Sequence, residues 1–79
     1  MYCYLVTYSF TDEKVVHGPY DSFDIAYEKM LAEAQVEYKI DETERNVPSK
    51  ICIDKENGTI TLATNMGDET YWEVIAMEV

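Results

Sequence analysis

A change in the period of the hydrophobic pattern constrains the fold of this chain more than any other feature. Residues Tyr2 to Phe10 alternate with a period of two, which is typical of a β-strand. From Asp21 to about Lys39 the apolar residues recur with the period of an α-helix. Beyond Pro48 the pattern returns to short β-rich runs. A helical segment between strand patterns favours an α+β fold.

The remaining strands are predicted from β-rich runs and the turn residues between them. A short strand of Val15, Val16 and His17 should pair with the first strand and stop at Gly18-Pro19. Two further runs, 50–54 and 59–64, bracket Asn57-Gly58, a strong hairpin signal. The last strand, 71–79, carries large apolar groups on both faces, which favours a central position in the sheet.

The helix has a clear beginning and one broad apolar stripe. Asp21 or Ser22 can cap its first N–H groups, and the chain should leave the helix near Lys39. Residues 40–49 are then a polar loop ending at Val47-Pro48. The stripe that should cover the sheet consists of Phe23, Ala26, Tyr27, Met30, Leu31, Ala34 and Tyr38. A second, narrower apolar strip consists of Ile25, Ala32 and Val36 beside Lys29.

These elements predict a single α+β domain, 1–79, with the order β-β-α-β-β-β. The sheet should be mainly antiparallel, with four or five strands, and the helix should pack on one face. Some aromatic or aliphatic side chains of the first strand are then expected on the uncovered face, which is a candidate contact or dimer surface. If a dimer forms there, a charged residue in place of Tyr4 or Tyr8 should dissociate it.

Composition narrows the classes of partner. Sixteen acidic against six basic residues give a net charge of -10, so direct binding of nucleic acid or anionic lipid is disfavoured. A hydrophobic fraction of 47% argues against disorder. The sequence shows neither a membrane-length apolar run nor a signal-peptide pattern, so we expect a cytoplasmic protein. Cys3 and Cys52 lie in apolar strand patterns and are expected to be reduced core residues.

The sequence indicates no assembled catalytic, metal or cofactor site. His17 is the single histidine and is expected at a strand end, without a nucleophile and orienting group around it. The run from Asp54 superficially suggests a calcium loop, but glycine stands at the fifth place and Asn65 replaces the required Glu. We therefore expect no enzyme activity and no cofactor.

The distribution of carboxylates is the remaining functional signal. Asp21, Asp24 and Glu28 follow one side of the predicted helix, Glu33 and Glu37 another, and the loop adds more. Helix carboxylates one turn apart are spaced by about 5–6 Å, comparable to phosphates along a nucleic-acid strand. The predicted partner-binding residues are Asp21, Asp24, Ile25, Glu28, Val36, Glu37, Asp41, Glu42 and Glu44. Ordinary solubilising charge is an equally good interpretation of the carboxylates.

The chain resembles small acidic proteins of phages and mobile elements, among them anti-CRISPR proteins. The resemblance rests on size, charge, the lack of an assembled active site and the aromatic strand from Met1 to Tyr8. It implies an inhibitor that acts by stoichiometric binding, in the host cell cytoplasm if the chain is phage-encoded.

Two functional hypotheses follow. In the first, the acidic helix and loop bind a basic, nucleic-acid-binding site on a protein such as a nuclease or CRISPR-Cas effector. The apolar anchors of this contact would be Tyr20, Tyr27, Tyr38 and the strip of Ile25 and Val36. In the second, the chain is an assembly protein that forms a homodimer through the open sheet face or an edge strand, and the charge only keeps it soluble.

Overall fold

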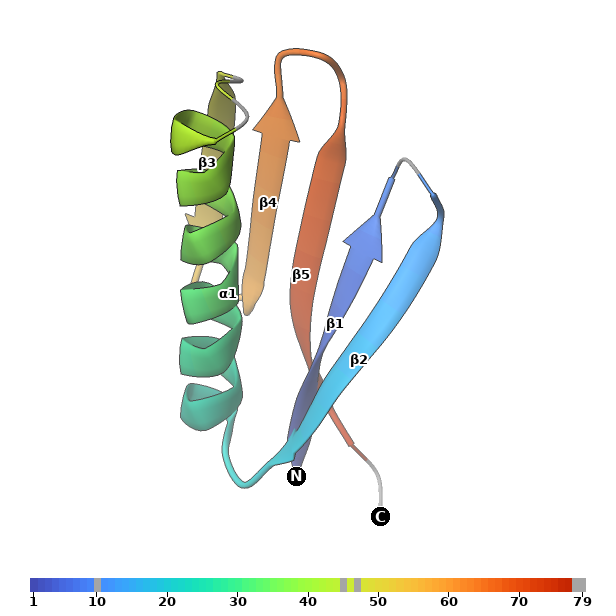
Figure 1. The fold of residues 1–79 in the computed structure, drawn as a ribbon. Coiled ribbons are helices and arrows are strands. Elements are labelled where there is room, and N and C mark those ends of the chain that lie inside the picture. The colour runs from blue at the N-terminus through green and yellow to red at the C-terminus, as the bar shows by residue number, and fades with distance from the viewer. Residues whose placement is uncertain (10, 45, 47, 78–79) are drawn as a thin grey trace.

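The computed structural model describes residues 1–9, 11–44, 46 and 48–77. Five strands and one helix are formed by these residues (Figure 1), in the chain order β1 (Tyr2–Tyr8), β2 (Glu13–Tyr20), α1 (Phe23–Thr43), β3 (Ser49–Asp54), β4 (Thr59–Thr64) and β5 (Glu69–Ala76). The strands form one antiparallel sheet in the order β2-β1-β5-β4-β3, and α1 packs against one face. The predicted α+β class and element order are confirmed. Phe10 and residues 78–79, predicted to extend the first and last strands, lie outside the described residues.

The centre of the sheet is β5, as the apolar residues on both of its faces predict. It pairs with β1 on one side and β4 on the other. Trp72 lies in this strand with no exposed surface, opposite Val6 of β1 and Ile60 of β4, which are equally buried. This row across three strands forms the middle of the core beneath the helix.

The predicted helical stripe is confirmed as the buried face of α1. Ala26, Tyr27, Met30 and Ala34 are buried, and Phe23, Leu31 and Tyr38 pack against the same core. Ser22 caps the helix, because its Oγ accepts a hydrogen bond from the N–H of Ile25 at 3.2 Å.

The predicted end of the helix was wrong. Instead of leaving the helix near Lys39, the chain stays helical to Thr43, and the N–H of Glu44 donates to the carbonyl of Ile40 at 2.9 Å. Pro48 disfavours helix only at its immediate neighbours, and no glycine offers an earlier stop. Asp41 and Glu42 therefore belong to the last helical turn rather than to a loop.

The second strand was predicted too short. The structure continues β2 through Gly18-Pro19, joined by a cis peptide bond, to Tyr20, with an irregular register opposite Tyr2 and Tyr4. Gly18 has φ +140°, and a Cβ atom there would lie 3.0 Å from the Cβ of Cys3. Glycine is required by both the backbone conformation and the close approach of β1.

Two further expectations were wrong in part. Tyr4 and Tyr8 lie on the face covered by α1, where Tyr4 is buried and Tyr8 packs against the core, so neither offers an open dimer surface. The opposite face is formed by residues of the other parity, including Leu5. Cys3 is buried and Cys52 is exposed on the edge strand, so only the first is a core cysteine; both are free thiols.

Candidate interaction surface on helix α1

The side of α1 that faces away from the sheet is fully exposed to solvent. We define the outer surface of α1 by the exposed residues of the helix from Asp24 to Glu42, which are Asp24, Ile25, Glu28, Lys29, Ala32, Gln35, Val36, Lys39 and Glu42. With a rise of about 1.5 Å per residue, this surface is about 27 Å long. Because the opposite face of the helix is held on the sheet, the backbone positions of these residues keep one arrangement.

An apolar strip runs along the middle of this surface. Ile25, Ala32 and Val36 follow one another at helical spacing, and the exposed fractions are 41% for Ile25 and 58% for Val36. Single exposed apolar residues are common on protein surfaces. Here three lie in line and point away from the core that the helix was expected to cover. The predicted second apolar strip is therefore exposed in the structure.

Carboxylates flank one side of the strip. At 100° per residue, Asp24, Glu28 and Glu42 lie on the same side of it, while Lys29 and Lys39 lie closer to it on either side. Asp21 and Glu44, just beyond the two ends of the helix, are also exposed. The structure therefore exposes these five predicted carboxylates, spread from one end of the helix to the other.

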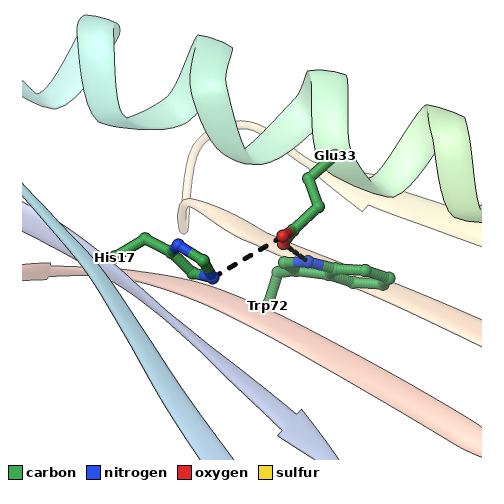
Figure 2. A network of polar contacts seen from close by, with 3 residues as sticks. All are labelled: His17, Glu33 and Trp72. Carbon is green, nitrogen blue, oxygen red and sulfur yellow. Dashed lines mark hydrogen bonds and ion pairs between the residues drawn. The ribbon is translucent and has the colours of Figure 1, made fainter.

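The other predicted row of carboxylates, Glu33 and Glu37, is only partly exposed. Glu33 points towards the sheet (Figure 2), where its Oε2 accepts a hydrogen bond from the Nε1–H of Trp72 at 2.7 Å. Its Oε1 lies 3.6 Å from Nε2 of His17. Glu33 thus links α1 to the central strand and to the edge strand β2. This three-residue network was missed, although a buried Trp on a central strand needs a hydrogen-bond acceptor and signals one.

His17 also differs from its prediction. It lies within β2 rather than at a strand end, and its ring stacks on Tyr4 with a centroid separation of 4.8 Å. Burial raises the pKa of the Tyr4 hydroxyl to about 12, and the negative charge of Glu33 adds to the shift. Burial likewise raises the pKa of Tyr8, with further contributions from Glu33 and Glu37. Glu33, His17 and Tyr4 thus belong to the packing between α1 and the sheet.

The structure places Asp41 and Glu37, two of the predicted binding residues, away from the outer surface of α1. Asp41 is only 2% exposed, because the helical turn that contains it places its side chain on the buried face. Glu37 is half-buried. Both line a small cleft between α1 and β4–β5, together with Leu62, Thr64, Met66, Asp68 and Thr70. The expectation that Asp41 lies in an exposed acidic loop was wrong, and a partner on the outer surface of α1 does not reach it.

The predicted aromatic anchors pack against the core and do not project from the outer surface of α1. Tyr27 is buried, with Nζ of Lys55 5.7 Å from its ring centroid, so it belongs to the core. Tyr20 and Tyr38 are half-buried and pack against that core. The side chains that project from the outer surface of α1 as apolar anchors are Ile25 and Val36.

The cysteines and the histidine considered as catalytic candidates do not come together in one site in the structure. Cys3 is buried, Cys52 lies on the edge strand farthest from β2, and His17 contacts Tyr4 and Glu33. The described part of the chain contains no group of three or more His, Cys, Asp or Glu residues that could hold a metal ion. Within the same residues, there is no helix with the length and apolarity that a membrane crossing requires.

The chain was compared with known proteins by sequence and by structure. Searches against protein-family models, curated proteins and solved structures found no significant match.

Proposed function

We propose that this chain is a non-enzymatic protein-binding module that inhibits a partner by occupying its basic, nucleic-acid-binding surface with the outer surface of α1. The observation that carries the proposal is the exposed apolar strip of Ile25, Ala32 and Val36 beside Asp24, Glu28 and Glu42. Complementary charge speeds encounter and selects the partner, whereas affinity requires apolar anchors that are desolvated on binding. The outer surface of α1 offers both.

The charge of the chain supports a basic partner. At -10 the chain repels polyanions and is attracted to surfaces rich in Lys and Arg, such as the groove of a nuclease or a CRISPR-Cas effector. Asp24 and Glu28 are one helical turn apart, and Glu42 extends the carboxylates to the far end of the helix. This arrangement can oppose a line of cationic side chains that otherwise binds a phosphate backbone.

The first experiment compares three baits in host lysate: the wild type, the helix variant D24K/E28K/E42K, and the matched variant E13K/E56K/E69K. Each variant changes the net charge by the same amount, and the matched variant alters exposed carboxylates outside α1. We expect a basic nucleic-acid-binding protein to be captured by the wild type and the matched variant and lost with the helix variant. Equal capture by all three baits would refute binding through the outer surface of α1.

The apolar strip is tested separately. The variant I25S/V36S should weaken binding to the captured partner at least about tenfold, because truncating buried anchors in an interface typically costs more than 1 kcal/mol. M66S is the matched control, since Met66 is 77% exposed and lies in the β4–β5 turn. Titration calorimetry measures both, and circular dichroism checks that each variant is folded. Equal affinities of I25S/V36S and M66S would remove the strip from the interface.

A further inference from the structure

The two edges of the sheet differ in how well they are protected against pairing with another chain. The β2 edge contains Gly18-Pro19 and has an irregular register with β1. The β3 edge contains neither glycine nor proline between Ser49 and Asp54 and pairs regularly with β4. Of the described strands, β4 alone is hydrogen-bonded to β3. An unpaired regular strand is a template for another strand unless charge or a bulge prevents it.

The ladder between β3 and β4 shows which backbone groups face outward. Asn65 donates its N–H to the carbonyl of Pro48 at 3.0 Å, which makes this pair a hydrogen-bonded one. In an antiparallel ladder such pairs alternate with non-hydrogen-bonded pairs. Continued along β3, the alternation directs the backbone groups of Lys50, Cys52 and Asp54 towards β4. Those of Ile51 and Ile53 face the free edge.

The sequence of β3 is suited to antiparallel pairing with a second copy of the same strand. In Lys50-Ile51-Cys52-Ile53-Asp54, an antiparallel pairing centred on Cys52 places Lys50 opposite Asp54 of the second copy and Ile51 opposite Ile53 of the second copy. Every such pair occurs twice by symmetry. Opposite charges and apolar residues are both favourable cross-strand partners. A shift of two residues places Lys50 opposite Cys52 of the second copy in one direction and opposite Glu56 in the other, and Glu56 lies beyond the end of β3, so only the register centred on Cys52 pairs the charges within the strand.

We propose that the protein forms a symmetric dimer by antiparallel pairing of β3 with β3 of a second copy, centred on Cys52. Ile51 and Ile53 then exchange backbone hydrogen bonds with the second copy. The pairing also covers Ile53, which is 48% exposed in the single chain. This inference does not rest on the proposed function of α1, because the pairing is made by β3; the outer surface of α1 only borders it, through Gln35, Lys39 and Glu42.

The groove beside β3 fits this arrangement. It is lined by Gln35, Tyr38, Lys39, Glu42, Ile51 and Ile53, between the second half of α1 and the edge strand. Because the symmetry axis is perpendicular to the sheet, both helices lie on the same face, and the isoleucines of the two copies meet beside this groove. Repulsion between two chains of charge -10 is screened beyond about 8 Å at physiological salt, while the Lys50–Asp54 pairs are in direct contact.

The charge pairs provide the first test, by sedimentation velocity at physiological salt over a wide range of protein concentration. K50D places two carboxylates opposite each other twice and should weaken the dimer about tenfold. K14D is the matched control, because Lys14 is an exposed lysine on the other edge strand. The charge exchange K50D/D54K should restore the dimer. A monomer at all concentrations, or equal dimerisation of K50D and K14D, would overturn the proposal.

Cys52 provides a second test that does not depend on changing Asp54, whose carboxylate accepts hydrogen bonds from Asn57 in the turn. In the proposed register the two Cys52 residues form a non-hydrogen-bonded pair with Cα atoms about 4.5 Å apart, within the range of a disulfide. Mild oxidation should therefore link two chains. C52S should remain unlinked, and so should C52S/T61C, which moves the thiol to the neighbouring strand. Absence of linkage in the wild type, or linkage in C52S/T61C, would contradict the register.

Discussion

Removing the carboxylate of Glu33 should destabilise the fold by about 2 kcal/mol, because it leaves the N–H of a fully buried indole without its acceptor. The hydrogen bond from Nε1 of Trp72 to Oε2 of Glu33 is 2.7 Å long, and Trp72 has no exposed surface. Hydrogen bonds to charged groups contribute about 1.5–3 kcal/mol, and Glu33 is partly exposed, which favours the lower half of that range. For a chain of 79 residues, 2 kcal/mol corresponds to a decrease in Tm of about 12 °C.

A double-mutant cycle separates this hydrogen bond from the other contacts of Glu33. In the W72F background the indole donor is gone, and E33A then removes the partly exposed contact with Nε2 of His17, which should cost less than about 0.5 kcal/mol. The expected coupling energy is about 1.5 kcal/mol. Urea unfolding of the four proteins, followed by circular dichroism, measures it. Equal effects of E33A in both backgrounds would refute the argument that Glu33 stabilises the fold through Trp72.

Three further predictions concern stability. The pKa of Tyr4 is raised to about 12 in the folded chain, so the neutral hydroxyl stabilises the fold fully below about pH 10, and this stabilisation is lost between about pH 10 and 12. The urea midpoint of the wild type should fall over this window, and that of Y4F should fall less. S22A should cost about 1 kcal/mol by removing the helix cap, measured by thermal unfolding, and an unchanged Tm would exclude that role. G18A should destabilise more than G67A, because both glycines have positive φ but only a Cβ at Gly18 meets Cys3; equal urea midpoints would contradict this steric argument.

Local patterns predicted most of the fold. The buried stripe of α1 and the Asn57-Gly58 turn depend on neighbours in the chain, and both are found where the periodicity and turn chemistry place them. The central position of β5 was predicted from the large apolar groups on both of its faces, and β1 and β4 pair with its two edges. These features needed no knowledge of long-range contacts.

The errors arose where distant segments meet. Whether Tyr4 faces the helix or solvent depends on which face of the sheet α1 covers, and the alternation of β1 is compatible with either. The network of His17, Glu33 and Trp72 joins three separate elements, so no spacing in the sequence reveals it. Asp41 was assigned to a loop because no glycine marks the C-terminal end of α1, so the sequence did not show that the helix continues to Thr43.

The corrections sharpen the candidate site. Asp41 and Glu33 leave the acidic surface because they pack against the sheet, whereas Asp24, Glu28 and Glu42 stay on it with the apolar strip. A charge reversal of Asp41 would therefore disturb the fold, and a loss of binding in that variant would not report on the outer surface of α1. The variant D24K/E28K/E42K avoids this, apart from a cost of about 0.3–1 kcal/mol for replacing an acidic residue in the first helical turn.

The most direct measurement of the proposed function is displacement of nucleic acid from the purified partner. Labelled nucleic acid bound to that protein is titrated with the wild type, D24K/E28K/E42K and E13K/E56K/E69K, and fluorescence anisotropy reports release. Competition for one basic surface predicts full release by the wild type and the matched variant, with a concentration requirement at least tenfold higher for the helix variant. Nucleic acid that stays bound while the wild type also binds the partner would contradict the account.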